Sequence, residues 1–407
     1  MTMQLSSKWP ILFLIWLMML VAYVDRIDMA VAGPSVTAAL HLSKAQFGWV
    51  LAAFTFGYAV MQIPGGYVAD RIGSRPLLVA AILVWSVFTA LTGMASSFVT
   101  LIAIRILFGF GEGIEIGPQF KLIGDYFSTK ERSQANSIFL SALALGPALG
   151  TPIAAWIIRD YGWREMFFAF SIPGFALAVL LFFMLPRGAK APSDQSASTS
   201  SVETAEERRT SMRRPAVWCC AAAYLFFNAT FWGFLSWVPT YLTSQRHITL
   251  AKLGLQGSIP YFVGFVGMVA VGHLGSTKWV HRRPQLVASS FLLAAGFLYL
   301  AMKATETTTC IAWLSISAFF IYGAFGPFWA VAIGLATPAA RGAFSGFINF
   351  CGQIGAFSSQ IIVGILADRM KSFDGAILFM VATITIAAVA IMGAARPRSS
   401  LQLKSVD

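Results

Sequence analysis

The chain has 407 residues, of which 57% are hydrophobic and 11% charged, and its formal net charge is +12. A soluble protein of this length would carry about 25% charged residues. The mean hydropathy of +0.72 therefore predicts an all-α, polytopic membrane protein. The sequence has no nucleotide-binding loop, zinc-ligand spacing or nucleophile elbow, so we expect neither an enzyme nor an ATP-driven pump, and no metal site.

About twelve apolar stretches are long enough to cross a bilayer, which takes roughly 20 residues per helix. They cover residues 10–38, 45–68, 76–95, 98–119, 135–158, 165–185, 215–242, 251–274, 284–302, 309–334, 342–366 and 375–395. An even number of spans places both termini on one side of the membrane. We expect that side to be the cytoplasm of a bacterial inner membrane, because roughly 19 of the 29 Lys and Arg residues then lie on the cytoplasmic side.

Residues 187–214 are rich in Ser, Ala, Thr and Glu and have little to bury, which is typical of a linker. This cytoplasmic linker divides the chain into two predicted six-helix bundles, at 1–186 and 215–407. A weak internal repeat with an offset of about 206 residues matches Gly66 to Gly272. Transporters built from two similar bundles bind substrate between them and alternate access.

Charged residues interrupt two of the apolar stretches. They are Asp25, Arg26 and Asp28 in the first stretch, and Arg105, Glu112 and Glu115 in the fourth. A charge near the bilayer centre costs about 2.5–3.5 kcal/mol on insertion scales. Such residues persist where they face one another or a watery cavity. The second half has no equivalent cluster, so we expect one half to handle charge and the other to supply neutral contacts.

The turn after the second stretch carries a glycine-rich, charged pattern. Its members are Gly66, Asp70, Arg71, Gly73 and Arg75. The pattern resembles the G-x-L-A-D-R-x-G-R-K signature of the major facilitator superfamily. This resemblance implies two six-helix bundles around a central cavity, with these five residues forming a conformational latch. The corresponding turn of the second half, 272–276, has lost the acid, so we expect that latch on one side only.

Further residues narrow the resemblance. The run from Tyr23 to Arg26, Arg105 followed by Glu112 seven residues later, and Asn349 are similar to the anion:cation symporter family. This family includes proton-coupled carriers of sugar acids, aromatic acids and sialic acid. The sequence departs from it at Asp28, where the family usually has Asn, and at Glu115, where an apolar residue is usual. Structural and substrate-tuning roles both stay open for these two acids.

Helix geometry predicts which charges meet. With a rise of 1.5 Å per residue, Asp25 and Arg105 both lie about 4–5 Å outward of the membrane centre and are expected to pair. Glu112 and Glu115 lie about 6 and 10 Å inward. The four acids outnumber the two arginines, so we expect the cluster to hold protons. We assign proton coupling to Asp25 and Glu112, with Arg105 holding these acids in place.

Arg26 is the predicted anchor for a substrate carboxylate, because its planar guanidinium binds both oxygens and stays charged. The predicted binding residues around it are Tyr23, Tyr58, Asn349 and Trp329, and the wider set of cavity candidates is Asp28, Glu115, Asn228 and Gln353. Aromatic residues crowd the seventh and tenth spans, where neutral hydrogen-bonding groups are few. We therefore favour an aromatic or weakly polar carboxylate over a sugar acid as substrate.

The sequence thus predicts proton-driven uptake of a small organic anion, with the proton as coupling ion and no other cofactor. The expected partners are the carboxylate substrate, protons and the lipid bilayer, without nucleic acid or an obligate protein partner. Two alternatives stay open. Efflux by proton antiport is favoured by the G-P-x-x-G pattern at Gly146, Pro147 and Gly150, and a non-transporting receptor or scaffold would use the same fold.

Overall fold

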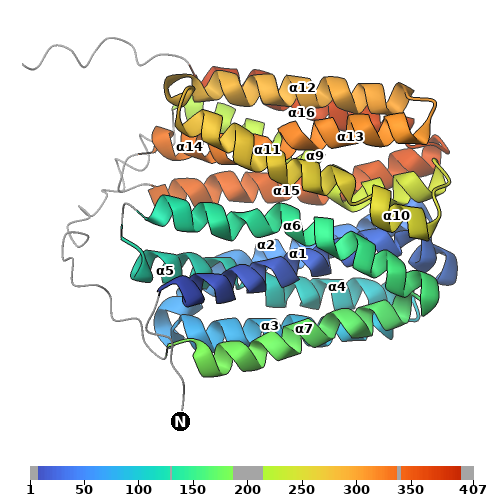
Figure 1. Ribbon diagram of the computed structural model, residues 1–407, viewed down its shortest axis with the longest axis horizontal. Coiled ribbons are helices and arrows are strands. Elements are labelled where there is room, and N and C mark those ends of the chain that lie inside the picture. Colours follow the sequence, from blue (N-terminus) through green and yellow to red (C-terminus); the bar gives the residue numbers. More distant parts are fainter. Residues whose placement is uncertain (1–7, 129–130, 187–213, 337–340, 396–407) are drawn as a thin grey trace, which may run out of the picture.

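The computed structural model describes residues 8–128, 131–186, 214–336 and 341–395, and these form helices without a strand. The helices of the first half are α1 (Lys8–Ala39), α2 (Lys44–Ile72), α3 (Ser74–Gly93), α4 (Phe98–Gly113), α5 (Ile116–Tyr126), α6 (Arg132–Asp160) and α7 (Trp163–Met184). Those of the second half are α9 (Pro215–Ser244), α10 (Leu250–Gln256), α11 (Ile259–Ser276), α12 (Arg283–Lys303), α13 (Thr307–Gly323), α14 (Phe325–Leu335), α15 (Arg341–Arg369) and α16 (Asp374–Ala394). Figure 1 shows the two halves as two helical bundles lying side by side.

All twelve predicted spans are helical. Ten helical segments in the described part of the chain are long and apolar enough to cross a membrane, and the other two expected spans are α2 and the α4–α5 pair. The largest boundary error is in the fourth span, which continues through α5 to Tyr126 rather than ending at residue 119. The predicted linker, apart from Arg214, lies outside the described residues.

We name the two ends of the molecule by the helix ends that lie there. The first helix, α1, begins and the last helix of the first half, α7, ends at the left of Figure 1, and we call this end the linker end. The opposite end, where α1 leads into α2, is the far end.

One span in each bundle is interrupted at an equivalent place. The fourth span breaks between Gly113 and Ile116, and the tenth breaks at Ala324. A membrane helix is broken only where the freed backbone groups are buried in protein or line a cavity. Glu115 and Ala324, which lie at the two breaks, are both fully buried, so the breaks lie inside the protein.

Glycines bring helices of the same bundle into backbone contact. A Cβ atom added to Gly109 of α4 would lie 2.3 Å from the backbone oxygen of Phe54 on α2. The second bundle repeats this crossing between α11 and α13, where a Cβ on Gly267 would lie 2.1 Å from the backbone oxygen of Phe319. Small residues allow this approach, which in a membrane supplies packing that lipid cannot. Each bundle is thus closely packed within itself.

The bundles touch each other most closely at the far end. A Cβ on Gly48 of α2 would lie 2.6 Å from the backbone oxygen of Gln360 on α15, and one on Gly33 of α1 would lie 2.8 Å from Thr240 Oγ1 on α9. Toward the linker end the bundles leave a cavity of about 430 Å³ between α6 and the α11 and α14 helices, with Ser141 and Phe325 among its walls. The structure is therefore closed at the far end.

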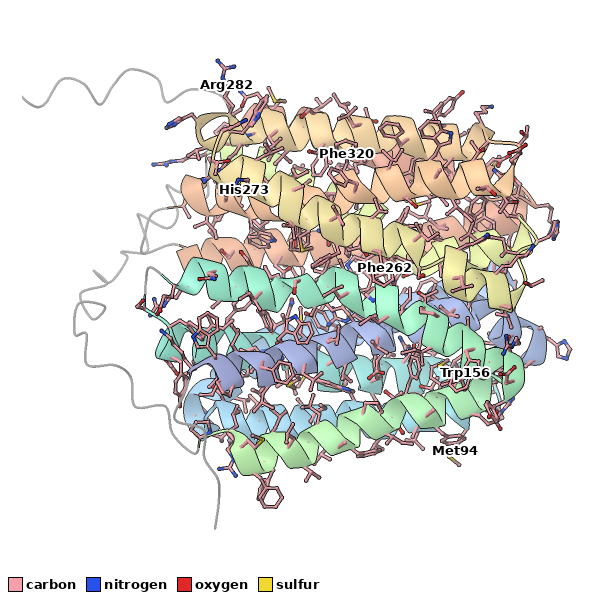
Figure 2. All side chains as sticks on the ribbon, viewed as in Figure 1. Met94, Trp156, Phe262, His273, Arg282 and Phe320 are labelled. Atoms are coloured by element: carbon pink, nitrogen blue, oxygen red, sulfur yellow. The ribbon has the colours of Figure 1, made fainter. Side chains whose placement is uncertain are left out.

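The outer surface is apolar, as a membrane protein requires. Met94, Trp156 and Phe262 are 66%, 52% and 41% exposed, and Figure 2 shows Met94 at the outer edge of the first bundle. The labelled polar residues His273 and Arg282 lie toward the linker end instead (Figure 2). Exposed hydrophobic side chains of this extent fit a lipid-facing surface.

The glycine crossing gives a direct test of bundle packing. We expect Gly109→Ala to lower the free energy of unfolding by about 1–3 kcal/mol, because its methyl group has no room against α2. The measurement is the thermal unfolding midpoint of the purified protein in detergent. Gly296→Ala in α12 is the matched control, since a Cβ there meets nothing within 4 Å. An equal midpoint for the two variants would contradict the close packing of α2 and α4.

Candidate functional site

The charged residues of α1 and of the fourth span meet inside the first bundle, and all six are buried. Arg26 is their centre. Its Nε donates to Glu112 Oε2 at 2.8 Å, and its Nη2 donates to Glu115 Oε1 at 3.4 Å. One arginine on α1 therefore binds two carboxylates placed on either side of the α4–α5 break.

Aromatic rings surround the guanidinium of Arg26. Its Cζ lies 4.3 Å from the ring centre of Tyr23 and 4.9 Å from that of Tyr58. Trp232, on α9 of the second bundle, lies 5.9 Å away. A cation over a ring face is stabilised by the ring quadrupole, and more so away from water. Tyr23 and Tyr58 lie at Arg26 as predicted, and Trp232 brings the second bundle to the site.

The expected pair between Asp25 and Arg105 is wrong. Arg105 Nη1 instead lies 3.9 Å from Asp28 Oδ1, and neither oxygen of Asp25 has a hydrogen-bond partner. Asp28 Oδ1 also accepts from the backbone N–H of Met29. Asp28 is thus the acid that Arg105 holds, while Asp25 is buried beside the pair with both oxygens unpartnered.

The contact between Arg26 and Glu112 has a related explanation. The depth estimate placed the middle of the fourth span at residue 108, but α4 and α5 together run from Phe98 to Tyr126. The middle of this longer span is about residue 112, which brings Glu112 to nearly the depth of Arg26. The arginine side chain covers the remaining distance.

The break between α4 and α5 positions Glu115. This residue directly precedes α5, is fully buried, and its Oε2 accepts from Gln119 Nε2 at 3.3 Å. The Oε1 of Gln119 is buried without a partner. The sequence left a structural and a substrate-tuning role open for Glu115, and the structure places it on Arg26.

The second bundle faces the charges with aromatic and amide groups. Tyr224 of α9 is stacked on Phe328 of α14 with ring centres 4.9 Å apart, and Trp329 lies edge-on at 5.1 Å. Asn228 Nδ2 donates to the backbone oxygen of Tyr224. Sequence reasoning named Asn228 and Trp329 but missed Tyr224, which lies one turn before Asn228 on the same helix. That spacing was the available signal.

Two other predicted residues of the second bundle lie on α15. Asn349 Nδ2 donates to Gln62 Oε1 of α2 at 2.9 Å, so Asn349 does join the bundles, although through an amide pair and not through the charged cluster. Gln353, four residues on, is buried with its Oε1 unpartnered.

The predicted latch is described only in part. For Gly66 and Asp70 the structure describes only the helical backbone. Arg71 is exposed, and Gly73 has the positive φ of +87° that glycine adopts readily. Arg75 is buried and donates to the backbone oxygen of Phe182 on α7. Arg75 thus binds its own bundle.

Comparison with known proteins adds to this geometry. The chain resembles the "Hexuronate transporter" of Bacillus subtilis (strain 168), with 27% identity over 404 residues and 96% of each chain covered. It is 29% identical to the "Probable galactarate/D-glucarate transporter GarP" of Escherichia coli (strain K12), covering 92% of this chain and 91% of that one. It is 27% identical to the "Probable sulfoacetate transporter SauU" of Cupriavidus necator (strain H16), covering 96% and 94%.

A solved structure shares the fold. The bacterial homologue of the human lysosomal transporter Spinster, in its inward-facing and unoccupied conformation, superposes with a TM-score of 0.77 at 20% identity and covers 95% of this chain and 96% of that one. The family model of the Major Facilitator Superfamily matches residues 12–359. With its two six-helix bundles, its multi-pass apolar surface and this match, the chain belongs to the Major Facilitator Superfamily of membrane transport proteins, and it is a transporter rather than an enzyme.

Proposed function

We propose that this transporter takes up a small organic carboxylate across the bacterial inner membrane by proton symport, with Arg26 binding the carboxylate. One observation carries the proposal: the guanidinium of Arg26 is buried between aromatic rings and donates hydrogen bonds to Glu112 and Glu115. Its planar donors fit a carboxylate oxygen pair. In this proposal both termini lie in the cytoplasm, and the proton is the coupling ion.

The charge balance of the cluster supports proton coupling. Asp25, Asp28, Glu112 and Glu115 face two arginines, so full ionisation would leave two uncompensated negative charges in a buried site. A buried carboxylate without a hydrogen-bond partner is costly, which favours a proton on Asp25, whose oxygens have none. An anion entering the site is favoured when such an acid is neutral, and disfavoured after the proton leaves.

The relatives support an organic anion as substrate. Those compared above are named for hexuronate, galactarate or D-glucarate, and sulfoacetate, which are all small organic acids. These names favour polyhydroxylated or compact acids, whereas the rings around Arg26 favour an acid with an apolar body. A binding panel for this protein therefore needs D-galacturonate, D-glucarate, sulfoacetate and benzoate.

The pattern that favoured efflux has a packing explanation. A Cβ on Gly146 of α6 would lie 2.4 Å from Tyr23 Cβ, and one on Gly150 would lie 2.8 Å from Ile27 Cγ2. These glycines let α6 lie against the helix that carries Arg26. Their role in positioning α1 requires no reversal of transport direction, so uptake is the function we propose.

Replacing the anchor tests substrate binding. We expect Arg26→Lys to weaken binding of the best panel acid at least tenfold, or about 1.4 kcal/mol, because an ammonium keeps the charge but loses the planar fork. Isothermal titration calorimetry on the purified protein measures this. Arg159→Lys is the control, since Arg159 is exposed and pairs with its neighbour Asp160. Unchanged affinity in Arg26→Lys would refute the anchor.

Removing the coupling acids tests the proton's role. We expect Asp25→Asn and Glu112→Gln each to abolish accumulation of the panel acid driven by a pH gradient in proteoliposomes, because neither variant can release a proton at that position. Glu112→Gln is expected to retain exchange of labelled for unlabelled substrate. Asp160→Asn, at an exposed acid, should accumulate normally. Accumulation by both coupling variants would refute the assignment.

A further inference from the structure

Glu115 lies where a substrate carboxylate would bind. Glu112 occupies Nε of Arg26 at 2.8 Å, while Glu115 occupies Nη2 at the longer distance of 3.4 Å. A substrate carboxylate approaching the open end of the guanidinium needs Nη2. An ionised Glu115 both fills this donor and repels an incoming anion.

The surroundings of Glu115 contain a hydrogen-bond acceptor for its proton. The ionisable groups that face it are Arg26 from α1, Glu112 from α4 and Tyr58 from α2. Gln119, one turn into α5, donates to Glu115 Oε2, and its own Oε1 is buried without a donor. A protonated Glu115 supplies that missing donor. The ionised acid is thus satisfied by Arg26, and the neutral acid by Gln119.

We propose that the Glu115 carboxylate occupies the substrate's binding position on Arg26 in the empty site, and that Glu115 takes up a proton from water when the anion binds. This inference rests on the proposed function of Arg26 as anchor. The substrate carboxylate replaces the Glu115 carboxylate on Nη2, the neutral Glu115 turns to Gln119, and the proton returns to water when the anion leaves. Substrate binding is thereby linked to a proton at a residue outside the family pattern.

The test compares two substitutions with opposite expected effects. Binding of D-galacturonate, D-glucarate, sulfoacetate and benzoate is measured by calorimetry between pH 6 and pH 8.5 in lipid nanodiscs. One linked proton changes the affinity about tenfold per pH unit. We therefore expect the affinity of Glu115→Gln to vary about tenfold less per pH unit than that of the wild type. We also expect this variant to bind at least tenfold more tightly at pH 8. Gln119→Met, which removes the acceptor for the proton, should weaken binding. Equal pH slopes in wild type and Glu115→Gln would overturn the inference.

Controls separate this inference from the proposed function. If Arg26→Lys binds as well as wild type, the anchor itself is refuted; if only Glu115→Gln is unchanged, Glu115 alone is refuted. If none of the four acids binds, infrared spectroscopy of the protein without ligand still tests Glu115. We expect infrared spectra of the empty wild type and of empty Glu115→Gln to show the same protonated carboxyl bands at pH 8, because Glu115 is ionised on Arg26 there, and the wild type alone to gain a further band as the pH is lowered. A protonated carboxyl band at pH 8 that Glu115→Gln lacks would overturn the role of Glu115.

A different observation, at the far end, carries a second inference. Asp368, near the end of α15, accepts hydrogen bonds from the backbone N–H groups of Lys44 and Ala45 at 3.1 and 2.7 Å. These are the first residues of α2, whose N–H groups have no partner within the helix. A Cβ on Gly364 would lie 2.5 Å from the backbone oxygen of Lys44. One carboxylate thus caps a helix of the opposite bundle where the backbones touch.

The sequence repeats this arrangement. The pattern G-x-x-A-D-R occurs at residues 66–71, where α2 ends, and again at 364–369, where α15 ends. The two helices are antiparallel neighbours, so the end of α15 lies beside the start of α2 at the far end, while α2 ends and α15 begins toward the linker end. Asp70 has the same place in the pattern at the linker end that Asp368 has at the far end.

We infer that Asp368 is a far-end latch that opposes the linker-end latch of Asp70. Its carboxylate satisfies two N–H groups and lies at the positive end of the α2 dipole. This contact stabilises the far-end-closed state, which is the state of the structure. Opening the far end breaks it, while closing the linker end brings Asp70 toward the start of α15.

Distances between spin labels measure the balance without a substrate. Labels on exposed Ser96 and Thr305 report the far end, in a background without the native cysteines. We expect Asp368→Ala to shift the population toward longer distances at least threefold, Asp70→Ala to shift it the other way, and the double variant to return toward wild type. Asp368→Asn, which keeps one acceptor, should be intermediate and decides the question if the alanine variant does not fold.

Asp374 provides the matched control. It lies at the same end, but accepts from Gln245 of its own bundle, so Asp374→Asn should leave the distances unchanged. Wild-type distances in both Asp368 variants would overturn the latch, as would an equal shift in Asp374→Asn.

Discussion

The buried pair between Arg26 and Glu112 is the constraint on which the first bundle depends. A charge without its partner in a low-dielectric interior costs about 3–5 kcal/mol, so α1 and α4 must stay in register. Glycines hold each of these helices against another helix of the bundle: Gly109 brings α4 against α2, and Gly146 brings α6 against α1. The first bundle is therefore a rigid frame around charged groups that would be unstable in a looser one.

The second bundle meets the site with uncharged side chains, and this follows from the same constraint. The ion pairs of the site all lie within the first bundle. The second bundle reaches the site with Trp232 and contacts α2 through the amide of Asn349. Moving one bundle past the other then exchanges ring and amide contacts, which have neutral alternatives, and breaks no buried ion pair. Such a division between a charged and a neutral wall lets the bundles move relative to each other without separating buried charges.

The fold and the positions of the charges could be predicted from sequence, but the pairing of the charges could not. Apolar length alone located the spans, because every one is bounded by turn or polar residues. The pairing failed because the break after Gly113 extends the fourth span to Tyr126 and moves its centre. A depth error of one helical turn is comparable to the reach of an arginine, so the prediction assigned Arg105 to Asp25 instead of Asp28 and gave Arg26 no acidic partner. Tyr224 was missed because its ring is one among many on that span, although its spacing of four residues from Asn228 places both on one face of the helix. The cap at Asp368 was readable in principle, since its six-residue pattern repeats that of Asp70.

The position of the Asp368 cap has a consequence for the speed of the transport cycle. The N–H groups it satisfies belong to the first turn of α2, at the far end of the molecule, and Lys44 beside them is polar. When the cap separates, water at the membrane surface replaces the carboxylate, and each exchanged hydrogen bond costs only about 0.5–1.5 kcal/mol. The same cap in the hydrocarbon layer would leave its donors unsatisfied at several kcal/mol each. Because the Asp368 cap lies at the aqueous edge, it stabilises the closed far end and can still be broken by thermal motion.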